Sequence, residues 1–360
     1  MSSGSTTAAA RRVMPVVPPL GAEAIPVDAR TEALDALAAL TRAATHLDDP
    51  DLFHRPRFRA KLHRRHAGSV AVEQLTEQVA TAAEDRAAAG LLAVQSVRAE
   101  LRERPGRRPC FDPDSLAELH RLLAAADPNI PGRGGFRRST ATVTWADGRR
   151  FAIAVTPGKQ LRSHVERWYH WATKTTSPAL DAAAFGMVRL FTIHPFPDAN
   201  GRVARLIAQC DLVAANLMPG LLLDLEGWVH SRRGEFDEAV VAAAEGNWTQ
   251  WGEVFARSVT ETAYHRIATI EAHRRILQSA TSRVADDLAA VAVLAQFRAS
   301  PAVSAGWLRD RISHDPQPAL TRLLNAGILA AHPRLPGALV HPQLTDVLDA
   351  PFDSPPAPRV

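Results

Sequence analysis

The sequence predicts a mainly α-helical protein with one small β-hairpin and a separate helical unit near its C-terminus. Over most of the chain, apolar residues recur every three or four positions, which is the period of an amphipathic helix. One pair of alternating runs, TATVTW and RRFAIAV, flanks the turn residues Ala-Asp-Gly, and Asp-Gly between such runs is a strong hairpin signal. A second series of short helical patterns begins near residue 286.

The composition limits the classes of protein to which this chain can belong. The chain has 360 residues, of which 46% are hydrophobic and 22% charged, so it can bury the cores of two or three domains. A formal net charge of +4 does not require a nucleic-acid partner. With only Cys110 and Cys210, a disulfide framework and a cysteine-rich zinc site are excluded. We find neither a signal-peptide core nor a run of about 20 apolar residues, so we expect a cytoplasmic protein without membrane contact.

The elements follow from this pattern in chain order. The helices that we expect lie at about 31–47, 69–101, 115–126, 161–173, 179–193, 201–216, 232–245 and 248–270, with the hairpin at 140–155. The start of the chain is rich in Ser, Thr, Ala and Pro, which favours an extended arm. The expected divisions are a flexible arm over 1–28, an N-terminal helical region over 29–105, a core over 106–265, a linker helix over 266–285, a small unit over 286–350 and a tail over 351–360.

The stretch HPFPDANGRVAR, residues 194–205, carries most of the chemistry. Its two prolines and Gly201 prevent a continuous helix, so it predicts a loop between a helix that ends near Ile193 and one that begins near Gly201. The backbone N–H groups of Asn200, Gly201 and Arg202 would then open a helix without intrahelical partners. Such a helix start binds anions, and phosphate in particular.

The side chains of this stretch suit the same ligand. Arg202 and Arg205 lie three residues apart, on one side of a helix, and each can donate two hydrogen bonds to a phosphate. Asp198 offers the oxygen ligand that Mg²⁺ prefers. His194 can accept a hydroxyl proton near neutral pH. Any one of these residues alone is more often structural, but together they favour the transfer of part of a nucleotide.

The stretch resembles the Fic signature, HPFx[D/E][G/A]N[G/K]R followed by a second arginine, and matches it at every fixed position. The segments GGFRR with the hairpin, and NWTQWGEVF, resemble other parts of that family, so the likeness covers about 106–265. It implies a Fic-fold helical bundle with a hairpin flap. It also implies transfer of AMP from ATP to a Ser, Thr or Tyr hydroxyl of a target protein, or of the chain itself, with release of pyrophosphate.

The resemblance implies a role for each residue of the motif. Target proteins would dock on the hairpin over 140–155 as an added strand. The remaining roles are His194 as general base, Phe196 as the anchor of the loop, Asp198 as the ligand of Mg²⁺, and Asn200, Gly201, Arg202 and Arg205 as the groups that bind the nucleotide phosphates.

The resemblance to this family also implies autoinhibition, a brake on the activity from within the chain. The segment SVAVEQ places Ser69 and Glu73 at the spacing of the inhibitory pattern [S/T]xxxE[G/N], although Gln74 departs from it. Glu73 would pair with Arg205, which could then no longer hold the γ-phosphate of ATP. The plain alternative is a solvent-exposed glutamate on a helix.

The unit over 286–350 shows three short helical patterns followed by a compact apolar turn, which is the order of a winged helix-turn-helix. Its candidate recognition helix, 317–325, has Arg322 as its single basic side chain, and the unit holds five arginines against six aspartates. DNA binding requires neutralised phosphates, so this balance argues against DNA and favours docking of a protein partner or support of a homo-oligomer.

Two alternatives to an AMP transferase remain at this point. The same site could remove AMP from a modified protein or use a different nucleotide. A protein of another class could sense a nucleotide and engage a partner or DNA through its C-terminal unit. His194, Asp198 and Arg202 favour an enzyme, because a pure binding protein has no need of a general base.

Overall fold

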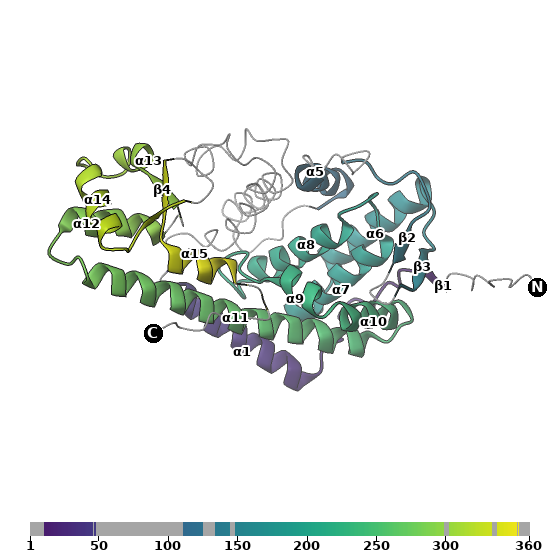
Figure 1. Cartoon of the computed structure of the whole chain (residues 1–360). Helices are drawn as coiled ribbons and strands as arrows, with labels where there is room; N and C mark the ends of the chain where they lie inside the picture. The colour runs from purple at the N-terminus through teal and green to yellow at the C-terminus, as the bar shows by residue number, and fades with distance from the viewer. Residues whose placement is uncertain are drawn as a thin grey trace, which may run out of the picture.

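The computed structural model describes residues 11–45, 47, 111–124, 134–144, 148–298, 302–332, 337–350 and 352. It confirms a mainly helical fold with a small antiparallel hairpin (Figure 1). The helices of the main body are α1 (Val27–Ala44), α5 (Pro113–Ala124), α6 (Lys159–Lys174), α7 (Ala179–Ile193), α8 (Asn200–Ala214), α9 (Leu225–Ser231), α10 (Arg233–Ala244) and α11 (Trp248–Ser282). Its strands are β1 (Arg11–Val13), β2 (Thr142–Thr144) and β3 (Arg150–Ile153).

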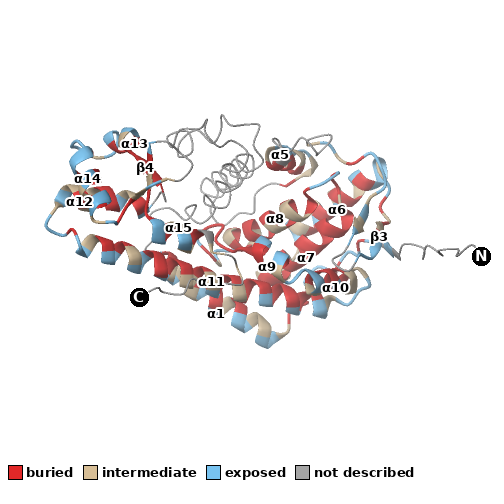
Figure 2. Ribbon diagram, in the orientation of Figure 1, coloured by how far each residue is buried: buried red, intermediate tan, exposed pale blue. Residues whose placement is uncertain are grey.

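Helix α7 lies at the centre of the body and is buried along nearly its whole length (Figure 2). Its sequence, ALDAAAFGMVRLFTI, is apolar on every side, which is the pattern of a helix enclosed by others. Two buried tryptophans fix its neighbours through indole N–H groups. Trp168 of α6 donates to the carbonyl oxygen of Gly186 at 3.0 Å, and Trp251 of α11 donates to that of Ala184 at 2.8 Å. The loop that follows α7 therefore continues from a buried helix that is held by neighbours on two sides.

Helix α11 connects the body to the C-terminal unit. We expected a core helix over 248–270 and a linker helix over 266–285, whereas the structure has one uninterrupted helix, Trp248–Ser282. The reason is visible in the sequence, because no proline or glycine follows Gly252 within this segment to break the helix. Helix α1 lies along α11 (Figure 1). Val259 of α11 belongs to the core of the body, and Leu277 to the core of the C-terminal unit.

The N-terminal segment differs from the flexible arm that we expected over 1–28. From residue 11 onward it packs on the body: β1 pairs in parallel with β3, and Ala24 and Ile25 are each 3% exposed. Their backbone N–H groups donate to the buried carboxylate of Asp181, at 2.7 and 2.9 Å. The sequence hides this anchor because Asp181 lies more than 150 residues away along the chain.

Gly252 of α11 also allows the N-terminal segment to pack closely on the body. A Cβ atom on this residue would stand 2.3 Å from the carbonyl oxygen of Ala24, a distance at which the two backbones would have to separate. Only glycine therefore lets α11 approach the N-terminal segment this closely.

The predicted hairpin is present, with Val143 opposite Phe151 in its register. Because β1 joins its other side, the sheet has the order β1-β3-β2. Within the described ranges, no helix combines the length and the apolar character needed to cross a membrane.

The C-terminal unit packs its helices against a second three-stranded sheet of order β4-β6-β5, whose pairings are antiparallel. Trp307 and Phe297 are buried in its core. Its assignment as a winged helix stays a prediction. The elements are α12 (Leu288–Ala295), a 3₁₀ turn (Gln296–Arg298), β4 (Ala302–Ser304), α13 (Ala305–Arg309), α14 (Gln317–Asn325), β5 (Ala330–Ala331), β6 (Ala338–Val340) and α15 (Pro342–Asp349).

Candidate active site

The candidate site is the loop between α7 and α8. Helix α7 ends at Ile193 and α8 begins at Asn200, as the prolines and glycine predicted. Two residues of the loop adopt the left-handed backbone conformation, His194 with φ 52° and Ala199 with φ 63°. This conformation is uncommon for residues other than glycine, and it clusters at functional sites where the surrounding structure enforces it.

The loop is fastened from inside by Asn200, which is 2% exposed. The side-chain amide of Asn200 donates to the carbonyl oxygen of Phe196 at 2.9 Å, and its side-chain oxygen accepts from the N–H of Phe196 at 2.8 Å. Phe196 itself is fully buried, where the resemblance placed the anchor of the loop. The side chain of Asn200 therefore holds the loop. Its backbone N–H, at the first turn of α8, is the group that it can offer to a phosphate.

A second support comes from His120 of α5, which was not among the site residues predicted from the sequence. This fully buried side chain stacks on the ring of Phe196, with ring centres 3.9 Å apart and an interplanar angle of 3°. Its Nδ1 accepts from the N–H of Gly134 at 3.1 Å, so Nε2 carries the proton and donates to the carbonyl oxygen of Asp198 at 3.1 Å. Burial lowers the pKa of His120 to about 4, which keeps it neutral in this role. A histidine at helical spacing among the leucines of LAELHRLL was the available signal.

Arg137 ties the hairpin to the loop. Its guanidinium donates to three carbonyl oxygens, those of His194 at 2.7 Å, Ser139 at 2.8 Å and Val155 at 2.5 Å. Its backbone N–H also donates to Pro195 at 2.9 Å. The side chain is 3% exposed, and burial lowers its pKa. The chain just before and just after the hairpin is therefore fixed against the residue that would act as base.

His194 has the geometry of a proton acceptor. Its Nδ1 lies 3.3 Å from the carbonyl oxygen of Phe191, which can only accept, so Nδ1 carries the proton and Nε2 keeps its lone pair. Burial lowers the pKa of His194 to about 4, a direction that Arg137 reinforces and that the bond to Phe191 and the nearby Asp198 oppose. The imidazole is therefore neutral at pH 7 and able to take a proton.

Asp198 is exposed at the tip of the loop and accepts a hydrogen bond from the N–H of Ala199. Among the described residues, no three His, Cys, Asp or Glu side chains converge on a possible metal position. A single carboxylate suits Mg²⁺ only when phosphate oxygens and water complete its shell. The residues present therefore fit a metal that arrives with a nucleotide.

The two arginines lie on the first turns of α8, both partly exposed. Arg205 pairs through Nη2 with Glu226 of α9 at 3.2 Å. Its guanidinium lies against Gly201, where an added Cβ would stand 3.0 Å from Nη1. Glu226 was not among the site residues predicted from the sequence. The proposed brake residues Ser69 and Glu73 lie outside the described residues.

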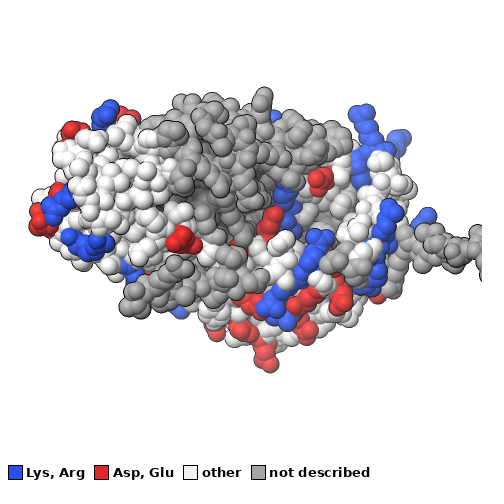
Figure 3. Space-filling model, in the orientation of Figure 1, with Lys and Arg blue, Asp and Glu red and all other residues white. Residues whose placement is uncertain are grey.

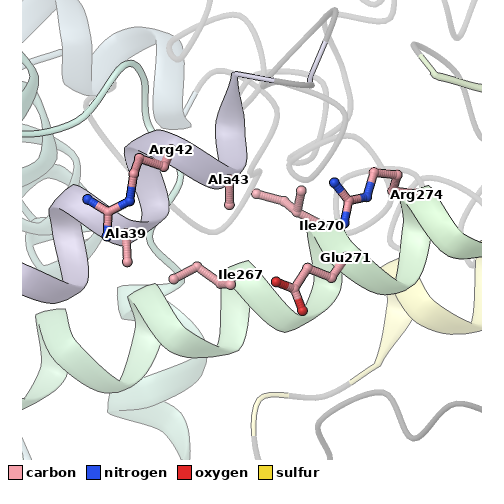
Figure 4. A pocket seen from close by; sticks show the side chains of 7 residues that line it. All are labelled: Ala39, Arg42, Ala43, Ile267, Ile270, Glu271 and Arg274. Atoms are coloured by element: carbon pink, nitrogen blue, oxygen red, sulfur yellow. The ribbon is translucent and has the colours of Figure 1, made fainter.

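A shallow pocket lies apart from this loop, between α1 and α11 (Figure 4). It has a volume of about 280 Å³ and contains none of the motif residues. It therefore does not serve the chemistry described above. It is lined by Ala39, Arg42, Ala43, Ile267, Ile270, Glu271 and Arg274.

Comparison with known protein families identifies the domain that contains this loop. Residues 110–211 match the Fic/DOC family, a range that contains His120, Arg137 and the whole motif. This part of the chain is a Fic domain. The mainly helical Fic fold with a hairpin flap, expected from the motif, is thereby confirmed.

The Fic domain is similar in sequence to parts of proteins that are named adenylyltransferases. The Protein adenylyltransferase Fic of Drosophila grimshawi is 36% identical over 112 residues, which are 30% of this chain and 21% of that protein. Protein adenylyltransferase fic-1 of Caenorhabditis elegans is 28% identical over 110 residues, or 30% and 20% of the two proteins. The chain thus spans about a fifth of the length of these curated relatives.

The fold likeness extends further than the sequence likeness. The solved structure of a Fic family protein from Desulfovibrio desulfuricans G20 superposes with a TM-score of 0.51 at 15% sequence identity. It covers 90% of this chain and 98% of the other. The arrangement of the helices is therefore shared over most of the chain, including parts beyond the matched Fic segment.

Proposed function

We propose that this protein is a protein adenylyltransferase that moves AMP from ATP to a Ser, Thr or Tyr hydroxyl of a target protein. One observation carries the proposal: a neutral His194, with Nδ1 tied to Phe191, precedes a loop that leads directly to the open start of α8. A proton acceptor and a phosphate-binding helix start in one rigid loop are what such a transfer requires. The names of the relatives support it.

In this mechanism the residues of the chain bind and orient the nucleotide and neutralise the charge of its phosphates. The N–H groups at the start of α8 and the guanidinium of Arg202 hold phosphate oxygens, and Arg205 holds the γ-phosphate. Mg²⁺ on Asp198 would neutralise charge on the phosphates. Nε2 of His194 accepts the proton of the target hydroxyl. As the oxygen bonds to the α-phosphorus, the bond from that phosphorus to the bridging oxygen breaks, and pyrophosphate leaves with the electron pair.

We propose that Glu73 restrains this activity by competing for Arg205. The structure supports the chemistry of such a brake in one respect, because Arg205 already accepts a carboxylate partner in Glu226 at 3.2 Å. A second carboxylate on the same guanidinium would remove its capacity for the γ-phosphate.

The C-terminal unit is proposed to dock a protein partner or a second copy of the chain. Arg322, the single basic side chain of α14, lies 2.6 Å from Asp286 and 3.3 Å from Asp287. A guanidinium engaged in this way within its own unit is poorly placed to neutralise a DNA phosphate.

Position-specific labelling tests the proposed reaction. The protein and its Glu73→Gly variant are incubated with Mg²⁺ and ATP labelled at either the α- or the γ-phosphorus, with and without cell extract. We expect protein-bound label from α-labelled ATP alone, with more in the Glu73→Gly variant. Label from the γ-position would indicate a kinase instead, and absence of label from both would contradict the proposal.

The same assay addresses the two alternatives at this site. Repeating it with α-labelled GTP, UTP and CTP identifies the donor, and preferential labelling from one of these would replace ATP. Release of AMP from a modified target on adding unlabelled protein would show that the site works chiefly in reverse.

A further inference from the structure

Arg205 folds back from the second turn of α8 towards the start of that helix. Its guanidinium lies beside Gly201, where an added Cβ would stand 3.0 Å from Nη1 and 3.6 Å from Cζ. This direction is the usual one, because side chains of a helix lean towards its N-terminus. The Nη1 group therefore lies at the helix start whose backbone N–H groups are proposed to bind phosphates.

The other terminal nitrogen of this guanidinium is held by a carboxylate. Nη2 of Arg205 donates to Oε2 of Glu226 at 3.2 Å. The side chain of Arg205 is 13% exposed, and its Nε is buried without a hydrogen-bond partner in the described part of the chain. Among the described residues, Glu226 is therefore the hydrogen-bonding group that decides where the guanidinium points.

The backbone that carries Glu226 is fixed in place. Glu226 lies in the first turn of α9, and the side chain of Asp224 caps this helix by accepting from the N–H of Gly227 at 2.9 Å. Leu225 and Trp228 anchor the helix in the core. The side chain of Glu226 itself is 53% exposed, so it can form an ion pair without a large cost of desolvation.

Other arginines next to α9 have partners of their own. Figure 3 shows acidic and basic side chains next to one another over α9 and α10. Arg232 pairs with Glu261 at 3.1 Å, and Arg233 pairs with Asp237 at 2.8 Å. The described residues around the helix thus form a surface of mixed charge, and not an acidic patch that would repel a nucleotide.

We propose that Glu226 is a positioning residue for ATP, which holds one terminal nitrogen of Arg205 so that the other points at the γ-phosphate. The inference rests on the proposed adenylyltransferase function and adds a residue to that site. A long arginine side chain loses conformational freedom when it binds a phosphate. Glu226 restricts this freedom before the nucleotide arrives, and its single hydrogen bond leaves other N–H groups of the guanidinium available.

This role is different from that of the proposed brake. Glu73 would take the N–H groups of Arg205 that the γ-phosphate needs, whereas Glu226 takes only Nη2. Replacing the two glutamates should therefore have opposite effects. Loss of Glu73 frees the guanidinium for ATP, while loss of Glu226 leaves the guanidinium without the contact that directs it.

Nucleotide binding to the full chain tests this without any transfer step. The probes are α,β-methylene ATP and α,β-methylene ADP, in which a methylene group replaces the bridging oxygen that the reaction would release. Their dissociation constants are measured by calorimetry with Mg²⁺ in the Glu73→Gly protein, where Glu73 does not compete. We expect the triphosphate to bind about tenfold tighter than the diphosphate, the scale of a hydrogen bond between charged groups.

Four variants are compared in this background, and thermal unfolding checks the fold of each. Glu226→Ala should reduce the preference for the triphosphate to about threefold or less and leave binding of the diphosphate unchanged. Glu226→Gln, whose amide oxygen can still accept from Nη2, should lie between Glu226→Ala and the parent. Glu238→Ala removes an exposed carboxylate of α10 and should bind both probes as the parent does. Arg205→Ala should abolish the preference, and adding Glu226→Ala to it should change nothing further.

Each outcome decides the inference. A preference for the triphosphate that survives Glu226→Ala would overturn it, and so would a preference that grows, since Glu226 would then compete with the nucleotide. Equal losses for both probes would show a structural role, and a parent without any preference would show that Arg205 does not hold the γ-phosphate; either result overturns the inference. The labelling assay stays separate, because a preference that depends on Glu226 in a protein that transfers no AMP would refute the proposed function alone.

Discussion

Replacing His120 by phenylalanine should weaken both the fold and the catalytic loop. His120→Phe keeps a ring that can stack on Phe196 and removes two hydrogen bonds, from Gly134 and to Asp198, each 3.1 Å long. A hydrogen bond contributes about 0.5–1.5 kcal/mol, and a polar group left unpaired in the interior costs about 1–3 kcal/mol. We therefore expect a loss of about 2–3 kcal/mol in the free energy of unfolding.

Urea unfolding followed by tryptophan fluorescence measures this loss, with an unchanged m-value as the check that both states remain comparable. His120→Ala, which also loses the stacked ring, should be less stable than His120→Phe by about 1 kcal/mol or more. The rate of AMP transfer should fall in both variants because Asp198 is no longer anchored through its carbonyl oxygen. Most substitutions at the surface change the free energy of unfolding by no more than about 0.5 kcal/mol. A His120→Phe variant whose loss stays within that range would refute the role of His120.

Three further predictions follow from packing and charge. Gly252→Ala places a Cβ 2.3 Å from the carbonyl oxygen of Ala24 and should cost about 1–3 kcal/mol in thermal or urea unfolding; an unchanged midpoint would disprove the close approach. Burial holds the pKa of His120 and of His194 near 4, below the unfolded value of about 6.5. The unfolded chain therefore takes up protons first, and stability should fall as pH drops from 6.5 towards 4, by about 2 kcal/mol per histidine at pH 5. A midpoint independent of pH across this window would contradict it. Arg189 is 2% exposed, its guanidinium lies 5.2 Å from the centre of the Trp171 ring, its Nε and Nη1 have no hydrogen-bond partner among the described residues, and burial lowers its pKa to about 10. Arg189→Met should therefore leave stability unchanged or raise it by about 1 kcal/mol, and a clear loss would show that this cation is stabilising.

The sequence predicted what local patterns determine. Prolines and Gly201 place the loop between α7 and α8, and alternation with an Asp-Gly turn places the hairpin at β2 and β3. The residues of the motif could be proposed as one site because they are adjacent along the chain. A local pattern could even indicate that His120 faces the core, since it stands at helical spacing among leucines.

What the sequence could not predict are contacts between distant residues. His120 meets Asp198 across 78 positions, Arg137 meets His194 across 57, and Asp181 meets Ala24 across 157. No periodic pattern in the sequence indicates which distant residues come into contact. The same limit explains the N-terminal arm. A proline-rich composition suggests an unpacked segment, whereas in the structure the buried carboxylate of Asp181 accepts hydrogen bonds from the backbone N–H groups of Ala24 and Ile25.

The central claim is that His194 acts on a hydroxyl proton and is not required to hold the nucleotide. The most direct test is a paired measurement on His194→Ala, with His170→Ala, an exposed histidine of α6, as the matched control. We expect the rate of AMP transfer to fall at least about 10²-fold, the scale of general-base catalysis, while the dissociation constant of ATP by calorimetry matches that of the control. An ATP affinity lost along with the transfer, or a transfer rate retained in full, would contradict the account.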